Sequence, residues 1–146
     1  MLDTCVYIDV IQGRTPSTVD MLLRARITNH SSICLSELAH LFGRLAPDHP
    51  ETERTLAKIE GAISRIPPRR LTAPSTRALG EAGMLAGLVA RLGGYPEDRQ
   101  AFLNDAILYL HAIEQGCIVL TRNLREFDFF DQLLPHRAVL FYRQAD

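Results

Sequence analysis

Apolar and polar residues follow two patterns along the chain: short apolar runs, and longer stretches in which apolar residues recur every three or four positions. The short runs predict buried strands and the longer stretches predict helices with one apolar face. Strands are predicted at residues 1–4, 31–35, 71–73, 117–121 and 138–142. Helices are predicted at residues 6–11, 17–27, 38–45, 55–66, 79–92, 105–115 and 127–134.

Chain breakers agree with these boundaries. Gly13 follows the first predicted helix, Pro67 and Pro68 end the fourth, and residues 95–103 read as a polar loop before a helix capped by Asn104 or Asp105. Strands that alternate with helices predict a three-layer α/β/α fold, with a central parallel sheet and helices on both faces. Ligands of such folds bind beyond the carboxyl ends of the strands.

Composition narrows the class of protein. A length of 146 residues with 47% hydrophobic content predicts one globular domain, and a formal net charge of −1 means that nucleic acid would be met by local basic patches. The three cysteines are odd in number and lie in apolar runs, which favours buried thiols in a reducing cytosol over a disulfide framework. No signal peptide or membrane span is evident, so we expect a cytoplasmic protein.

Acidic residues stand beside several of the apolar runs. Asp3 ends the first run, Glu37 follows the second, Asp105 opens a later one, and Asn123 and Glu126 follow residues 117–121. Each acid taken alone has a structural explanation as a helix cap or a first-turn charge. Acids that converge on one sheet edge repel one another, however, and a hard cation with oxygen ligands relieves that repulsion. The pattern therefore favours a Mg²⁺ or Mn²⁺ site.

Four segments carry a resemblance to a known family. Residues 2–4 (Leu-Asp-Thr), 36–38 (Ser-Glu-Leu), 104–107 (Asn-Asp-Ala-Ile) and 120–127 (Leu-Thr-Arg-Asn-Leu-Arg-Glu-Phe) occur in the order typical of PIN-domain ribonucleases. The chain resembles in particular the VapC-like toxins of bacterial type II toxin–antitoxin pairs, along essentially its whole length. The resemblance implies a PIN-like fold and a metal-dependent endoribonuclease, held inactive by a cognate antitoxin encoded beside it.

The resemblance also assigns roles by position. Asp3, Glu37 and Asp105 match the first three acids of the family, and Asn123 matches the fourth, where Asp is common. Because Asn123 carries no charge, Glu126 is a candidate additional ligand of the ion, or holds a water beside it. Together these residues would bind Mg²⁺ or Mn²⁺ and hydrolyse RNA without a Ser or His nucleophile.

Further residues are assigned supporting roles. Cys5 stands where the family often has Asn or Ser, and we expect this change to remove a polar group that orients Asp3. Thr4 is a candidate hydrogen-bond donor to Asp3 or to a phosphate. Candidate contacts to RNA phosphates are Arg14, Arg122 and Arg125, with Arg24 and Arg26.

Apolar residues in excess of what helices on a small sheet can bury predict association. The positions concerned are Leu22, Leu23, Leu41, Phe42 and Phe129. From them we expect a homodimer and a tight contact with the antitoxin, whose Arg or Lys would lie against the acids.

Two other interpretations compete with this one. Glu37 and His40 have the Glu-x-x-His spacing of di-iron bundles, but His111 and Glu114 reverse it. The remaining histidines are expected at the surface: His30, His49 and His136. The stronger alternative is a catalytically weakened PIN-fold module that binds a protein or RNA without cleavage, which the neutral fourth position and Cys5 favour.

Overall fold

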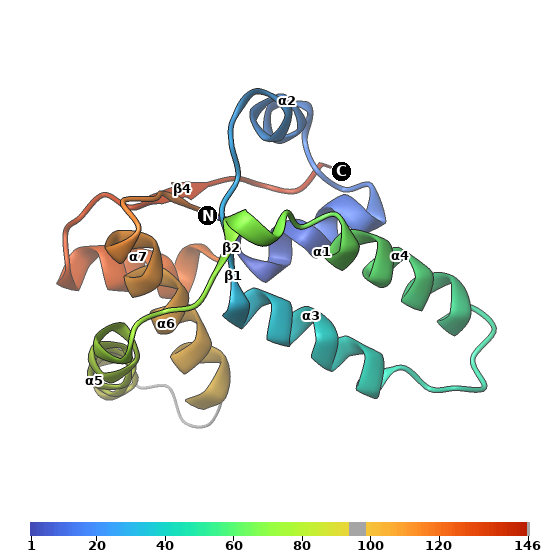
Figure 1. Ribbon diagram of the computed structural model, residues 1–146. Coiled ribbons are helices and arrows are strands. Elements are labelled where there is room, and N and C mark those ends of the chain that lie inside the picture. Colours follow the sequence, from blue (N-terminus) through green and yellow to red (C-terminus); the bar gives the residue numbers. More distant parts are fainter. Residues whose placement is uncertain (94–98, 146) are drawn as a thin grey trace.

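The computed structural model describes the backbone of residues 1–93 and 99–145, and their side chains except at residues 99–101. Short strands separate groups of one to three helices along this part of the chain (Figure 1). The helices are α1 (Thr4–Gln12), α2 (Ser17–Ala25), α3 (Ser32–Arg44), α4 (Thr52–Ser64), the short 3₁₀ helix η1 (Pro68–Arg70), α5 (Thr76–Gly93), α6 (Arg99–Glu114) and α7 (Leu124–Leu133). The strands are β1 (His30–Ser31), β2 (Leu71–Thr72), β3 (Val119–Thr121) and β4 (Val139–Phe141).

The strands are short and parallel, as the alternating pattern predicted. β1 pairs with β2 and β3 pairs with β4. The N-terminal segment lies between the two pairs: Leu2 forms a parallel bridge with Leu120, and its N–H donates to the carbonyl of Asn29, just before β1. The carboxyl ends of β3 and of this segment therefore meet at one edge.

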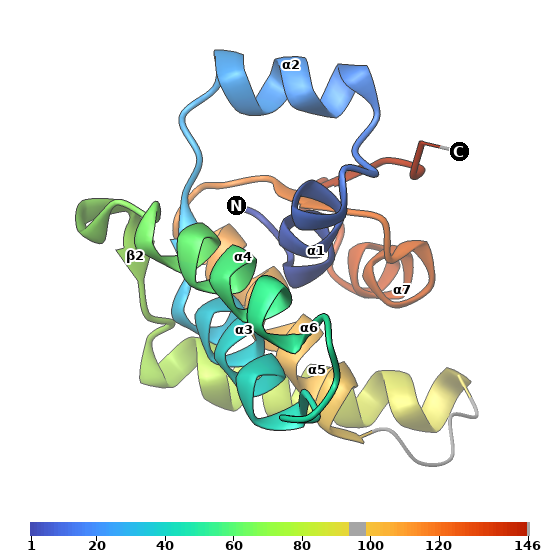
Figure 2. The same ribbon diagram turned by 90° about the vertical axis from the view of Figure 1, so that its right-hand side faces the viewer.

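Helices lie on both sides of these strands. Figure 1 shows α5, α6 and α7 grouped on one side and α1, α3 and α4 on the other, and in Figures 1 and 2 α2 stands apart from both groups. The fold is thus an α/β fold with a parallel sheet, as expected.

Helix α6 contains a long buried stretch. Its residues 106–112 are all buried, and Tyr109 packs against Phe130 of α7 with ring centroids 5.8 Å apart. Phe130 in turn meets Phe127 edge to face at 5.7 Å. Full burial of such aromatic side chains contributes about 1.5–3 kcal/mol each. A polar residue within the stretch 106–112, such as His111, is consequently withdrawn from water.

The predicted strand at residues 1–4 is reduced to a bridge at Leu2, because α1 begins at Thr4. Two further predicted boundaries are wrong by several residues. Of the predicted strand at residues 31–35 only Ser31 belongs to a strand, because its side chain accepts a hydrogen bond from the Ile33 N–H at 3.3 Å and α3 starts at Ser32. The apolar run after it lies on the buried face of a helix, where Cys34 and Leu38 are one turn apart. A short apolar run does not by itself distinguish a strand from a buried helical turn.

The second error concerns the start of α6. The helix begins at Arg99, so the predicted polar loop is wrong from residue 99 onward and Asn104 and Asp105 are not caps. Phe102 is buried, and the packing of α6 against α5 extends the helix beyond its expected first turn. The rest of that predicted loop, residues 95–98, lies outside the described residues.

Candidate active site

Asp3 lies where the N-terminal segment passes into α1, beside the end of β3. Its side chain is only 5% exposed, and its Oδ2 accepts hydrogen bonds from the Thr121 hydroxyl at 2.6 Å and the Cys5 thiol at 2.9 Å. Asp3 occupies the N-cap position of α1, but its side chain makes no capping hydrogen bond. The carboxylate is therefore held by the sheet edge rather than by the helix terminus.

From its sequence position we expected Cys5 to remove a polar contact to Asp3. The structure shows that Cys5 makes such a contact itself. Its thiol donates to Asp3, and its sulfur accepts the backbone N–H of Arg122 at 3.4 Å. Burial, followed by the nearby charge of Asp3, raises the pKa of the Cys5 thiol to about 12. The side chain is thus a neutral donor that orients Asp3.

Glu37 lies in the second turn of α3, beyond the first turn in which the helix dipole would explain its charge. Its carboxylate accepts the hydroxyl of Thr4 and, at 2.7 Å, the Nδ2 amide of Asn104. Thr4 therefore serves Glu37 and not Asp3, contrary to expectation. These bonds join α1, α3 and α6 at one point, and Asn104 is a contributor that its sequence position alone did not assign.

Asp105 faces the start of α7 from the middle of α6. Its Oδ2 accepts the Nδ2 amide of Asn123 at 2.9 Å. Burial raises the pKa of the Asp105 carboxyl well above its usual value, and the negative charges of Asp3, Glu37 and Glu126 raise it further, while the bond from Asn123 opposes them. The fold thus brings the other three predicted acids close enough to Asp105 to disfavour its charged form.

These side chains suit a divalent ion chemically, although their arrangement is not that of a closed site. Across residues 1–93 and 102–145, no group of three or more His, Cys, Asp or Glu side chains is arranged to hold a metal ion. The available donors are carboxylate and amide oxygens, which Mg²⁺ and Mn²⁺ prefer. Burial is the first cause of the raised pKa of Asp105 and neighbouring negative charges are the second, and a bound cation would relieve the repulsion from those charges.

The candidate RNA contacts have different surroundings. Arg14, Arg24 and Arg26 are exposed. Arg122 is 41% exposed, and its Nε lies 3.0 Å from an Oδ2 of Asp9, a fully buried carboxylate. Asp9 was not among the predicted site residues. Its sequence signal is an acid within the otherwise apolar stretch of residues 6–11.

The di-iron interpretation is not supported by the geometry. His40 is exposed on α3, whereas His111 is buried and hydrogen-bonds Ser31 and Thr72. His30, predicted at the surface, is also buried, and its Nδ1 pairs with the Tyr7 hydroxyl. A polar residue in a short strand can be buried in the core when a hydroxyl group is there to hydrogen-bond it.

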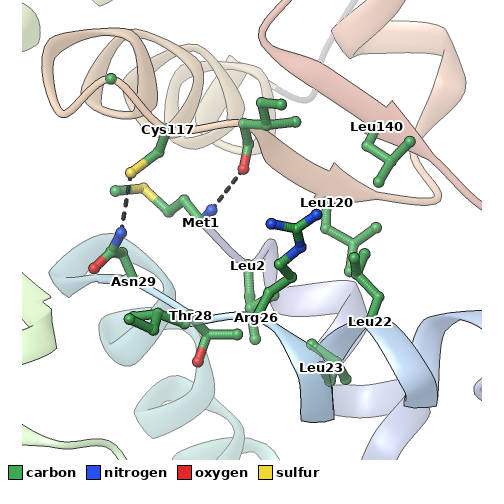
Figure 3. Close-up of a pocket in the computed structure, with 13 residues that line it drawn as sticks. Met1, Leu2, Leu22, Leu23, Arg26, Thr28, Asn29, Cys117, Leu120 and Leu140 are labelled. Atoms are coloured by element: carbon green, nitrogen blue, oxygen red, sulfur yellow. Dashed lines mark hydrogen bonds between the residues drawn. The ribbon is translucent and has the colours of Figure 1, made fainter.

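An apolar groove of about 570 Å³ lies between α2 and the strands (Figure 3). Leu22 and Leu23 of α2 form one wall, and Leu120 and Leu140 of β3 and β4 form the other. Of the other apolar residues singled out for association, Leu41 and Phe129 pack against the core and Phe42 is 37% exposed. No helix in the described part of the chain is long and apolar enough to span a membrane.

No family model and no curated protein sequence matches the chain. Solved structures do. The DNA-bound VapBC of Salmonella typhimurium matches with 30% identity and a TM-score of 0.61 over 88% of this chain and 89% of that one. VapBC2 of Rickettsia felis, bound to a fragment of its promoter, matches with 20% identity and a TM-score of 0.66 over 98% of both chains.

A third similar structure is VapBC-1 of nontypeable Haemophilus influenzae, with 20% identity and a TM-score of 0.64 over 90% of this chain and 92% of that one. The two matches at 20% identity establish the fold, and the Salmonella match adds sequence similarity over most of both chains. They agree with the resemblance carried by the acidic segments. The chain therefore belongs to the VapC-like PIN-domain family.

Proposed function

We propose that this protein is a metal-dependent endoribonuclease and the toxin of a type II toxin–antitoxin pair. The observation that carries the proposal is the convergence of Asp3 and Glu37, which lie far away in the sequence, on Asp105, whose pKa their charges raise. A fold bears such carboxylate repulsion where the charge has a use. Family membership makes RNA hydrolysis the reaction that best fits this arrangement.

The residues divide the work as follows. Asp3, Asp105 and Glu37, with Asn123 and Glu126, would hold Mg²⁺ or Mn²⁺. When bound, such an ion supplies Lewis-acid stabilisation of the charge on the phosphate. The Thr121 and Cys5 donors fix the orientation of Asp3, and the hydroxyl of Thr4 and the amide of Asn104 fix Glu37.

Positive charge must bring the RNA to this acidic site. With an overall formal charge of −1, general attraction of the polyanion is absent. Arg14, Arg122 and Arg125 are the proposed phosphate contacts, Arg122 and Arg125 by their position on either side of Asn123 and Arg14 by its exposure beyond α1.

The cellular setting is part of the proposal. The solved relatives are VapBC complexes, so we propose a cognate antitoxin that places an Arg or Lys against the acids. The partly exposed apolar side chains, including Phe42 and the Leu22–Leu23 wall of the groove, support a homodimer and this contact. The three free cysteines support a cytoplasmic location.

Metal-dependent cleavage tests the function directly. Protein purified under denaturing conditions and refolded, to remove any copurifying antitoxin, should cleave single-stranded RNA in Mg²⁺ or Mn²⁺ and not in EDTA. Asp3→Asn and Glu37→Gln should each abolish cleavage and leave circular dichroism unchanged. Wild-type activity in both variants would remove the metal-nuclease hypothesis.

The second candidate is a PIN-fold module that binds a partner or RNA without cutting. The neutral amide of Asn123 at the fourth position favours it. Two measurements separate the functions. The module binds RNA or antitoxin equally well with and without divalent ions, and neither it nor its acid-to-amide variants inhibit bacterial growth when expressed alone.

A further inference from the structure

Asp9 is a buried charge with an unusually complete set of partners. Its side chain is 0% exposed. Oδ1 accepts the Gln144 amide at 2.6 Å, and Oδ2 accepts the Tyr142 hydroxyl at 2.6 Å and lies 3.0 Å from Nε of Arg122. A carboxylate removed from water is costly unless it is paired and hydrogen-bonded, so these contacts must all form together.

The partners connect Asp9 of α1 to the edge of the candidate active site. Arg122 directly precedes Asn123, and its backbone N–H is bound by Cys5, which also donates to Asp3. Tyr142, just after β4, donates its backbone N–H to the carbonyl of Thr121 at 3.1 Å. The loop between β3 and α7 is therefore fastened on two sides, through Cys5 and through Asp9.

The guanidinium of Arg122 is held at one edge only. Its Nε faces Asp9, its side chain is 41% exposed, and within the described part of the chain its terminal Nη groups have no hydrogen-bond partner. An arginine anchored through Nε loses little further side-chain entropy when its Nη groups bind an anion. The two Nη groups match a phosphate in bidentate geometry.

We propose that Asp9 is a positioning residue that holds Arg122 ready to bind a backbone phosphate of single-stranded RNA beside the acidic cluster. The inference rests on the proposed nuclease function. It explains how an acidic site on a nearly neutral protein receives a polyanion: the buried negative charge of Asp9 fixes a positive charge next to Asn123.

Substitution of Asp9 by Asn separates positioning from structure. In Asp9→Asn the Oδ1 still accepts the Gln144 amide, and the new Nδ2 can donate to the Tyr142 oxygen, which then acts as acceptor. The neutral amide removes the charge that pairs with Arg122, so this ion pair is the contact that is lost. Gln144→Leu is the matched control, because it removes a 2.6 Å hydrogen bond to Oδ1 and leaves the ion pair.

Affinity for a labelled single-stranded oligoribonucleotide is measured by fluorescence anisotropy in EDTA, and cleavage in Mg²⁺. We expect Asp9→Asn and Arg122→Ala each to weaken binding about tenfold, the size of one charge-assisted hydrogen bond. The Asp9→Asn/Arg122→Ala double variant should bind no worse than either single variant. In both single variants the slope of log affinity against log salt should fall by about 0.7, the value for one phosphate on a single strand.

Kinetic constants distinguish a positioning role of Asp9 from a purely structural one. Asp9→Asn should raise KM and leave kcat nearly unchanged, as expected for lost uniform binding, whereas Gln144→Leu should lower the melting temperature and leave KM and the salt slope unchanged. Equal losses of affinity in Asp9→Asn and Gln144→Leu, or strict additivity with Arg122→Ala, would overturn the inference.

Failure of the proposed function is distinguishable from failure of this inference. Wild-type protein that binds RNA in EDTA but does not cleave it in Mg²⁺ contradicts the nuclease, and the affinity and salt-slope comparison then decides the role of Asp9. Wild-type protein that neither binds nor cleaves RNA overturns both.

Discussion

Helix α6 carries the fully buried His111 and the partly buried Asp105, and the fold gives these two polar side chains opposite surroundings. His111 is buried with both ring nitrogens hydrogen-bonded, Nδ1 to Ser31 at 3.0 Å and Nε2 to Thr72 at 3.1 Å. Asp105, less than two turns away, meets one amide donor and the charges of three other carboxylates. The hydrogen-bonding groups of His111 all have neutral partners, whereas the carboxylate of Asp105 is repelled by other negative charges.

The difference separates stability from function. The His111 network joins β1, β2 and α6 and keeps the imidazole neutral, since burial lowers its pKa. The Asp105 centre opposes folding at neutral pH, since burial and like charges raise its pKa. Residues that carry function are often arranged at the expense of stability, and here both arrangements lie on one helix.

The largest expected effect is on cleavage and comes from substitution of Asp105. Asp105→Asn should lower cleavage by on the order of 100-fold or more, because the loss of even an outer partner of a metal ligand costs up to that amount. The same change should raise the melting temperature in EDTA, because one repelling charge is gone. The matched control is Glu114→Gln on the exposed end of α6, which should alter neither quantity much. An Asp105→Asn protein that is both active and less stable would contradict the comparison.

Substitution of His111 is expected to lower stability and to leave catalysis unchanged. His111→Ala should destabilise the protein by about 2–4 kcal/mol, because it creates a cavity and leaves the hydroxyls of Ser31 and Thr72 without their partner. Denaturant unfolding measures the loss. Cleavage per folded molecule should stay at the wild-type value, and a parallel loss of kcat would place the network in the active site.

The pH dependence of stability should carry opposite contributions from the two centres. The pKa of His111 is lowered below 6.5, so its contribution is present above pH 6.5 and is lost as pH falls, with a slope of at most about 1.4 kcal/mol per pH unit. The pKa of Asp105 is raised above 3.8, so its contribution is present below pH 3.8 and is lost as pH rises. Chemical denaturation between pH 4 and 7 should therefore show a steeper acid loss in Asp105→Asn than in wild type. Parallel curves of stability against pH for wild type and Asp105→Asn would exclude a contribution from the Asp105 carboxyl.

The smallest expected effect concerns the fourth position of the cluster. Asn123→Asp should tighten Mg²⁺ binding by added charge, and Glu126→Gln should then weaken Mg²⁺ binding less in that variant than in wild type. Calorimetric Mg²⁺ titration over the four proteins measures the coupling. Strict additivity would mean that Glu126 and Asn123 do not bind the same ion. Glu126 would then act only by raising the pKa of Asp105 through its charge, from the first turn of α7.

Sequence reasoning succeeded where local pattern and function coincide. The run of residues 117–121 followed by Asn123 predicted a strand end with a polar residue, and β3 ends there. The parallel α/β fold and the family also followed from the chain alone. These features depend on neighbours in the sequence, because strand ends and the turns after them are encoded locally.

Tertiary packing decided the rest. The run of residues 33–35 became helix because Ser31 caps α3, and Asp105 became an interior position because α6 extends back to Arg99 along α5. Which donor serves which acid also depended on the fold, as the thiol of Cys5 shows by reaching Asp3. The pairing of Asp9 with Arg122 joins residues 113 positions apart (122 minus 9). The periodicity of a sequence cannot predict such pairs, because burial and the distance between two side chains are set only when the elements pack together.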